Sequence, residues 1–422
     1  MEPKDFITFR NIPLLDAATA DQTSTVGEPT VANNGRNIFA TGNWYASTST
    51  NNGNSLQYIN PYNTLPPAAG GFCCDQVAIY DRSRDIMVWL LQYITRNNTN
   101  VLRIAINRGP AYDSGGWYWW DFSPVGTNSD WSGEWFDYPD LALSSNHLWL
   151  TSNVFRVGGG WTRAVVFKFP LDALAAGTSL GYQYYSTTEF GSLRLTQGAK
   201  ETMYFASHKS TSAIRIFSWP DMTNDISWND VDVAVWNNVN ASAANGTAWM
   251  SRTDRRITGA WVANNVIGLA WTVGSKGSRP FPHVRVVRVN EQTKALVDEP
   301  DLWSNNAAYA YPAVCPNDRG HLGLSIFYGG GDRKPSFLVG ISDDYTADGR
   351  FALRYAAVGT HAPADNKWGD YLTVRRHSPD GLTWHASGFT LQGGNTRQNI
   401  VPRIVHFGRR RDRRAVQRWI NS

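Results

Sequence analysis

The sequence repeats one pattern seven times. Each unit has an apolar strand, a turn rich in Asn, Asp, Ser, Arg or Gly, a second apolar strand, and a third in which apolar and polar residues alternate. One position in the first strand aligns all of the units: Val31, Val77, Leu141, Leu193, Thr258, Val314 and Leu372. The spacings are 46, 64, 52, 65, 56 and 58 residues, which is the length of four short strands with their loops. A sheet of this kind cannot bury both faces alone, so a series of them stacks radially into a propeller.

The repeat therefore predicts an all-β fold, a seven-bladed β-propeller with four-stranded antiparallel blades. We expect a single domain over residues 1–408, followed by a basic tail over residues 409–422. A strand near Phe6–Arg10 would pair with a strand at 400–408, so that the ring closes and no edge stays open. Third strands of the blades are expected at these ranges: 101–107, 163–170, 213–220, 283–290 and 336–342. The one candidate helix covers 171–177. Two β-sandwiches would need a linker near the middle of the chain, and the sequence shows none.

Composition and charge exclude several classes of protein. Hydrophobic residues make up 42% of the chain and 19 residues are Trp, so the chain is not disordered. No apolar run reaches the roughly 20 residues that a membrane-spanning helix needs. The net charge is +4, but residues 403–422 alone carry +6, which leaves −2 for the rest. The other basic residues are scattered, so we expect no nucleic-acid partner. The tail is then either a solvated terminus or an arm that binds phosphate or an acidic polymer.

Three cysteines leave the redox state open. The neighbours Cys73 and Cys74 could form a vicinal disulfide, one of them could pair with Cys315, or all three could be reduced and buried. Their spacing is not that of a zinc site. The first ten residues lack the basic end and apolar run of a secretory signal. The chain is therefore either cytoplasmic or a processed form of a secreted or extracytoplasmic protein, and we expect the second.

Two short phrases resemble a known hairpin motif. SPDGLTW at 378–384 and STNNGNSLQY at 49–58 look like degenerate Asp boxes, the motif of sialidase-like and other Asp-box propellers. The resemblance implies a seven-bladed propeller and a carbohydrate ligand. The three-arginine carboxylate clamp of sialidases is not found, so sialidase activity is not implied.

Antiparallel pairing predicts where a ligand site lies. The starts of the first strands and the ends of the second strands meet at one mouth of the central channel, here called the strand-start mouth. The turns between them lie at the other mouth, the turn-side mouth, where we expect ordinary solvated hairpins. Acidic, imidazole and phenol groups at the strand-start mouth are the candidate catalytic residues: Glu28, Asp75, Asp140, Asp370, His208 and Tyr311. Amides, bases and aromatic side chains there are the candidate substrate-binding residues: Trp44, Gln76, Gln92, Asn153, Lys209, Arg255, Arg256, Trp271, Tyr328 and Tyr371.

Each candidate also has a structural explanation. Carboxylates at strand starts often accept hydrogen bonds from backbone N–H groups or from arginines that hold blades together. A lone His208 can be a hydrogen-bonded structural residue, and only one of the neighbours Arg255 and Arg256 can point inward. The aromatic stretches 115–124 and 130–140 are expected in a long loop, which either packs between blades or forms a wall on which sugar rings stack.

These residues favour a carbohydrate-active enzyme. In a glycoside hydrolase, two of the four carboxylates would act as acid and as nucleophile or base. In a polysaccharide lyase, Arg255 or Arg256 would neutralise a uronate, His208 would remove the neighbouring proton, and a tyrosine would protonate the leaving oxygen. The alternative is a carbohydrate-binding lectin or an adhesion or scaffold propeller without catalysis, although the blade mouths are too dissimilar for repeated lectin sites. We expect a monomer that acts on an oligo- or polysaccharide and needs no cofactor; a structural calcium ion on the axis would be compatible with the residues around it.

Overall fold

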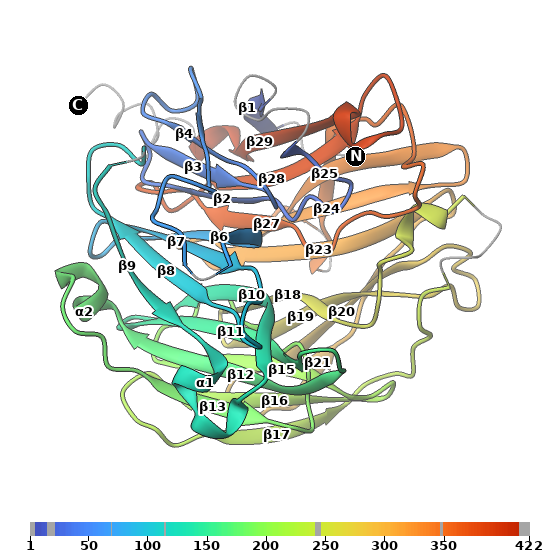
Figure 1. The fold of residues 1–422 in the computed structure, drawn as a ribbon. Coiled ribbons are helices and arrows are strands. Elements are labelled where there is room, and N and C mark those ends of the chain that lie inside the picture. Colours follow the sequence, from blue (N-terminus) through green and yellow to red (C-terminus); the bar gives the residue numbers. More distant parts are fainter. Residues whose placement is uncertain are drawn as a thin grey trace.

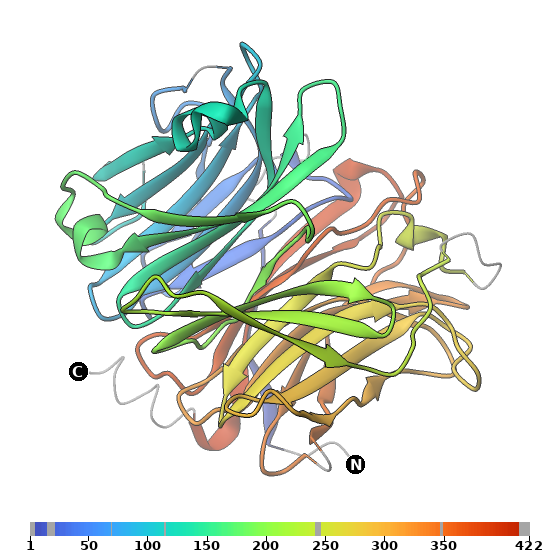
Figure 2. The ribbon, with the colours of Figure 1, turned by 90° about the horizontal axis from the view of Figure 1, so that it is seen from below.

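The computed structural model describes residues 5–14, 22–68, 70–113, 115–240, 246–346 and 349–412. These residues form seven antiparallel sheets, each with four strands paired in series, and one sheet carries an additional short strand. The predicted seven-bladed propeller is confirmed (Figure 1). The sheets follow one another in chain order from the blue strands to the red ones, and Figure 2 shows the green, yellow and orange sheets packed face to face.

The blades are numbered here along the chain. Blade 1 contains β2 (Thr30–Asn33), β3 (Ile38–Thr41), β4 (Ala46–Ser49) and β5 (Gln57–Ile59). Blade 2 contains β6 (Phe72–Asp81), β7 (Ile86–Tyr93), β8 (Leu102–Asn107) and β9 (Trp117–Phe122). Blade 3 contains β10 (Glu134–Leu143), β11 (His147–Arg156), β12 (Trp161–Pro170) and β13 (Gln183–Thr187). Blade 4 contains β14 (Arg194–Leu195), β15 (Thr202–Ser210), β16 (Ala213–Pro220) and β17 (Ser227–Asp232).

The second half of the ring follows the same order. Blade 5 contains β18 (Ile257–Ala263), β19 (Val266–Val273), β20 (His283–Asn290), β21 (Leu296–Asp298) and the short β22 (Asp301–Leu302), which also pairs with β20. Blade 6 contains β23 (Ala308–Pro316), β24 (Leu322–Gly330), β25 (Arg333–Ser342) and β26 (Ala352–Ala357). Blade 7 contains β27 (Thr373–Arg376), β28 (Trp384–Leu391), β29 (Ile400–Arg409) and β1 (Phe6–Pro13).

Blade 7 closes the ring as the sequence predicts. Its fourth strand, β1, pairs antiparallel with β29, so the first described strand of the chain completes the last sheet. The first strands of neighbouring blades contact each other all the way around, including β27 against β2. The central channel is therefore lined by β2, β6, β10, β14, β18, β23 and β27.

The apolar core lies between the sheets. Each hydrophobic cluster draws residues from neighbouring blades; one joins Val31 of blade 1 to Ile404 of blade 7, and another joins Trp89 of blade 2 to Phe39 of blade 1. This is the packing that alternating strands require, because each sheet buries one face against the blade before it and the other against the blade after it.

Helices are few, and the aromatic stretch forms strands. The predicted helix is α2 (Leu171–Ala176), which ends at Gly177 with a left-handed φ of 67°. The other helical segments with both ends among the described residues are α1 (Pro124–Thr127), η2 (Ser129–Trp131), η3 (Ala248–Met250), η5 (Arg397–Asn399) and η6 (Arg410–Asp412). The prediction of a long loop over 115–124 and 130–140 is wrong. Residues 117–122 are the outer strand of blade 2 and β10 begins at residue 134, in keeping with the strong strand preference of aromatic residues.

Other sequence predictions meet the fold only in part. Arg409, the first residue of the expected tail, is the last residue of β29 and is buried against Asp343 and Asp5; residues 413–422 lie outside the described residues. The phrase at 378–384 covers the turn between β27 and β28 and the first residue of β28, and the phrase at 49–58 runs from the last residue of β4 into β5. They occupy different turns of their blades, and membership of the Asp-box propellers stays a prediction. In the part of the chain that is described, no helix is long and apolar enough to span a bilayer.

Candidate active site

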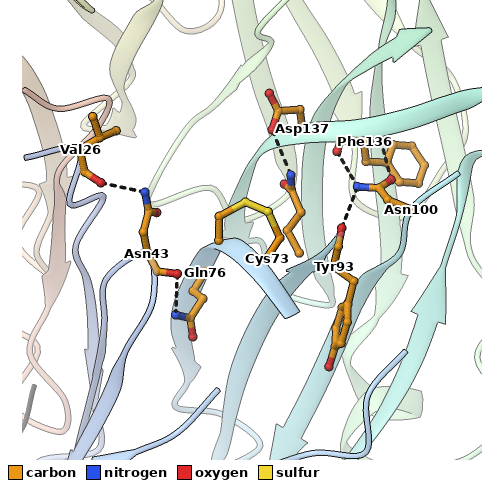
Figure 3. Close-up of a disulfide and its surroundings, with 10 residues drawn as sticks. Val26, Asn43, Cys73, Gln76, Tyr93, Asn100, Phe136 and Asp137 are labelled. Carbon is orange, nitrogen blue, oxygen red and sulfur yellow. Dashed lines mark hydrogen bonds between the residues drawn. A yellow bond between two sulfur atoms is a disulfide. The ribbon is translucent and has the colours of Figure 1, made fainter. Parts of the chain in front are cut away.

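The strand-start mouth is shaped by irregular entries into the first strands. Between Phe72 and Gln76 of β6, three residues face a single residue of β7. Cys73 and Cys74 within this bulge form a disulfide, and Cys315 is free and buried. Of the three redox alternatives, the vicinal disulfide is the one observed (Figure 3). The bulge also sets Asp75, directly after the disulfide, at the channel mouth.

Four other blades enter the channel through a left-handed residue. Glu28, Tyr138 and Tyr311 each lie three residues before the aligned position and each precede a proline, with φ of 43°, 56° and 57°. Gly369 occupies the same place before Asp370, with φ of 99°. A side chain in this conformation costs roughly 1–2 kcal/mol, and such residues tend to gather at functional sites. Asn43 at the end of β3 donates to the Val26 carbonyl at 2.7 Å and holds the segment before Glu28 in place (Figure 3).

The carboxyl groups of Glu28 and Asp75 form a hydrogen-bonded pair. Both residues are buried, with exposed fractions of 4% and 8%. Burial raises the pKa of Glu28 well above its ordinary value, and the charges of Asp75 and Asp370 raise it further. Burial and the charge of Asp137 raise the pKa of Asp75 to about 7. Burial and the charge of the neighbouring carboxyl oppose ionisation of both groups together, so the two titrate as a coupled pair.

Asp137 and Asp370 complete the carboxyl cluster. Gln92 donates to Asp137 at 3.0 Å, yet burial raises the pKa of the Asp137 carboxyl. Asp370 is held by two arginines: Arg252 lies 2.5 Å and Arg256 3.2 Å from its carboxylate oxygens. The cluster therefore combines one carboxylate that is fully paired with three carboxyls that hold protons unusually well.

Aromatic rings border this cluster. The Arg256 guanidinium lies 4.2 Å from the centroid of the Tyr138 ring, and Tyr138 packs against Tyr371 with ring centroids 5.8 Å apart. Burial and the charges of Glu28 and Asp75 raise the pKa of Tyr371 well above its ordinary value, so its hydroxyl stays protonated. Tyr311 donates to the Trp368 carbonyl at 2.6 Å.

Asp140 lies deeper in the channel. Its carboxylate is 3.3 Å from Arg194, and it also interacts with the buried Arg375. This ion pair matches the structural explanation for strand-start carboxylates, in which an arginine holds two blades together.

His208 does not join the cluster. It lies at the end of β15, and its ring packs against Trp236 and Trp271 with centroids 4.9 and 4.7 Å apart. Burial and the charge of the neighbouring Arg255 together lower its pKa to about 3. Arg255 is exposed, and of these two neighbours only Arg256 reaches the cluster.

The remaining candidates serve the scaffold where the structure shows their partners. Gln76 is buried, donates to the Gly42 and Tyr45 carbonyls and accepts from Trp89. Asn153 and Ser192 exchange hydrogen bonds across blades 3 and 4. The other three pair or pack as follows: Lys209 with Asp230, Tyr328 with Ser304 and Tyr309, and Trp44 against the core of blades 1 and 2. Their roles in substrate binding stay predictions, as do the roles of the whole predicted set.

The turn-side mouth is more open than its solvated hairpins suggest. A cavity of about 360 Å³ opens there, lined by residues of several turns that include Arg82, Lys200, Asp318 and Arg376. Its charged groups are largely paired, because Arg82 lies 2.9 Å from Asp318 and Arg376 bonds to the same carboxylate. This mouth offers space, whereas the strand-start mouth offers groups that can exchange a proton.

Two residues of the cluster are not predicted by the rule that selects residues at strand starts and strand ends. Asp137 lies three residues before the candidate Asp140. The sequence feature that could have indicated Asp137 is Tyr138-Pro139, where a bulge displaces the start of the strand. Arg252 lies in the connection between blades 4 and 5, directly after η3. That connection has no counterpart in the repeat, so no sequence pattern predicts its side chain.

Comparisons with known proteins find only distant structural likenesses. No protein-family model matches the sequence, and no curated protein is significantly similar to it. A solved arabinanase from Penicillium chrysogenum, complexed with arabinobiose, is 10% identical over 94% of this chain and 98% of that chain, with a TM-score of 0.44. The SapL1 lectin with α-methyl fucoside is 9% identical over 82% and 100%, with a TM-score of 0.42. The Trypanosoma rangeli sialidase with the inhibitor DANA is 10% identical over 76% and 58%, with a TM-score of 0.41. Likenesses this distant carry no argument about activity.

Proposed function

We propose that this protein is a glycoside hydrolase whose proton donor is the Glu28–Asp75 pair. The observation that carries the proposal is this buried, hydrogen-bonded pair of carboxyls with raised pKa values. A carboxyl that stays protonated near neutral pH can protonate the oxygen of a glycosidic bond, which an ordinary carboxylic acid cannot do there. Tyrosine rings and carboxylates at the same mouth suit an oligo- or polysaccharide, whose CH faces pack on aromatic rings.

The proposed reaction uses the cluster as follows. The pair gives its proton to the leaving oxygen while the C–O bond breaks. The carboxylate of Asp370, which Arg252 and Arg256 hold in place, stabilises the positive charge that develops on the sugar ring. The ionised form of Asp137 takes a proton from the attacking water and then releases it to solvent, and solvent returns a proton to the pair. Glu28 and Asp75 are too close to act as acid and nucleophile, because those groups lie at least about 5 Å apart in glycosidases.

The arrangement favours hydrolysis over the lyase alternative. A lyase would need a free arginine for the uronate, whereas Arg252 and Arg256 both bind Asp370. The base predicted for the lyase, His208, packs between two tryptophans away from the cluster.

A panel of neutral and acidic polysaccharides tests the proposal. We expect new reducing ends on at least one of them, no ultraviolet absorbance from a new double bond, and loss of the activity in Glu28→Gln. Ultraviolet absorbance would identify a lyase instead. Tight binding of a glycan that stays intact, unaffected by Glu28→Gln, would identify a lectin and overturn the proposal.

A further inference from the structure

Three of the eight histidines of the chain meet inside blade 7. His377 follows β27, and His385 on β28 lies directly opposite His406 on β29. One nitrogen from each ring lies within 4.8 Å of the other two. All three side chains are buried, and their ring centroids are 4.4 to 5.0 Å apart. This group is separate from the carboxyl cluster, since the turn after β27 lies on the turn side of the propeller.

The face of the sheet that carries the histidines looks towards blade 1. Trp384, one residue before His385, donates to the Cys315 carbonyl of blade 6. Successive side chains of a strand point to opposite faces, so His385 points away from blade 6. On that side, the backbone N–H of Ser378 donates to Asn33 of blade 1.

The surroundings leave nitrogens of this group without partners. Among the described residues, neither nitrogen of His385 nor Nε2 of His377 has a hydrogen-bond partner. Buried polar atoms are nearly always paired, so these unpaired nitrogens require an explanation.

The outer nitrogens of the group are held by oxygen atoms. Asp380 Oδ2 lies 2.6 Å from His377 Nδ1, and Thr383 Oγ1 lies 2.8 Å from His406 Nε2. A carboxylate behind a histidine is the usual arrangement that orients a metal ligand. Arg10 is the arginine whose positive charge is felt by His385 and His406. Its Nη1 donates to other groups, the Asn52 carbonyl at 2.6 Å and Asn54 Oδ1 at 2.7 Å.

We propose that His377, His385 and His406 bind one Zn²⁺ ion. Imidazole nitrogens suit zinc and the neighbouring transition metals, whereas calcium and magnesium take oxygen ligands. At Zn–N distances of about 2.0–2.1 Å, tetrahedral ligand atoms lie about 3.3 Å apart, so small side-chain rotations would close the group around an ion. The ion would tie β28, β29 and the turn after β27 together in the sheet that closes the ring.

Zinc stoichiometry tests the proposal. Protein treated with EDTA would be incubated with Zn²⁺, separated from free metal by gel filtration and analysed by mass spectrometry. We expect one zinc per chain for the wild type and a higher melting temperature with zinc than without it, because a ligand of the folded state stabilises it. His385→Gln and His406→Gln should lose the zinc. His283→Gln is the matched control, since His283 is a buried histidine of blade 5 outside this group, and it should keep one zinc.

Two results would overturn the proposal: a wild type that retains no zinc after gel filtration, or a His385→Gln variant that retains as much zinc as the wild type. If both variants fail to fold, the visible spectrum of the wild type with Co²⁺ decides. Nitrogen ligands give tetrahedral Co²⁺ absorption without a thiolate band, and the spectrum of free aqueous Co²⁺ would show a cluster that is only packing. Hydrolysis by the carboxyl cluster does not depend on the outcome.

Discussion

At the strand-start mouth, Glu28 and Asp75 are buried carboxyls that bond to each other, whereas at the turn-side mouth the carboxylate of Asp318 is flanked by Arg82 and Arg376. Both mouths are built from the same repeated sheets. They differ in how the acidic groups are paired: among the described residues Glu28 and Asp75 form no ion pair, although Asp370 beside them is paired with Arg252 and Arg256. Burial without a partner raises carboxyl pKa values, and such shifts gather at catalytic sites. An ion pair at the surface contributes little more than local order.

The backbone also distinguishes the two mouths. The strand-start mouth holds left-handed Glu28, Tyr138 and Tyr311 at equivalent places, while the adjoining bulges move side chains off the regular register. Strain and unpaired acids thus occur together at one mouth. The repeat therefore builds the channel, and its local departures build the site.

Replacing either carboxyl of the pair should have the largest effect. We expect Glu28→Gln and Asp75→Asn to lower kcat by about 10²- to 10⁴-fold, because each removes the shared proton donor. The measurement is the rate of release of reducing ends from whichever glycan the wild type cleaves. Asp318→Asn is the matched control at the other mouth and should stay within about twofold of the wild type. Equal losses at both mouths would mean that the variants act through the scaffold.

The pH dependence of activity should show the raised pKa. Since the pKa of Asp75 is raised to about 7 and that of Glu28 is raised well above its ordinary value, the pair retains a proton up to neutral pH. We expect kcat/KM to fall with rising pH only above about pH 7. In Asp75→Asn the residual activity should fall at lower pH, because Glu28 loses the like charge that raises its pKa. A wild-type profile that already falls between about pH 4 and 5, where an ordinary carboxyl titrates, would contradict the assignment of the proton donor.

The same pKa shift should make the folded state less stable as pH rises. Between about pH 4 and 7 the folded protein keeps the Asp75 proton that the unfolded chain releases, so the free energy of unfolding falls across this range. The difference between wild type and Asp75→Asn cancels the titrating groups other than Glu28, whose pKa the substitution lowers and whose contribution therefore has the same sign. Urea titrations at several pH values should show Asp75→Asn gaining stability relative to the wild type, by on the order of a few kcal/mol in total. A constant difference would mean that Asp75 titrates normally.

Most of the fold can be predicted because it follows from short-range patterns. The predicted third strands 213–220 and 283–290 coincide with β16 and β20, since alternation of apolar residues marks a strand with both faces packed. The ring closure follows from the need to cover the edge of the last sheet. The aromatic stretch is misplaced because its glycines and acids indicate a loop, whereas sheet pairing at the outer edge of blade 2 overrides them.

The site is predicted less completely, for geometric reasons. The strand-start rule places Glu28, Asp75 and Asp370 at one mouth, and these carboxyls do interact. The rule wrongly places His208 beside these carboxyls. It predicts at which mouth a side chain lies, but not whether the side chain points to the axis of the channel or between two blades. Arg252 comes from a connection that no repeat describes. The register between strands and the geometry of the loops therefore limit which site residues can be assigned from the sequence alone.

A methyl group at position 369 should test the strained entry. Gly369 has φ of 99°, and a Cβ there would lie 2.3 Å from the Tyr311 ring. We expect Gly369→Ala to lower the free energy of unfolding by roughly 2–4 kcal/mol, from backbone strain and overpacking together. Gly133→Ala is the matched control, because Gly133 also has a left-handed φ, of 74°, and an added methyl group there would meet nothing within 4 Å; it should cost only the backbone part. Equal losses in the two variants would show that the ring of Tyr311 yields freely.

The smallest effect is expected from the ion pair of the turn-side mouth. Arg82 and Asp318 are 2.9 Å apart, but their side chains are 42% and 33% exposed, and Arg376 also bonds to Asp318. Solvent and salt screen such a pair, so Arg82→Ala should lower the free energy of unfolding by no more than about 1 kcal/mol, and less at high salt. Activity should not change. A large loss of activity would mean that the turn-side cavity takes part in substrate binding. The contrast between the two mouths would then be wrong, because the paired charges of the turn-side mouth would have a functional role and not only a structural one.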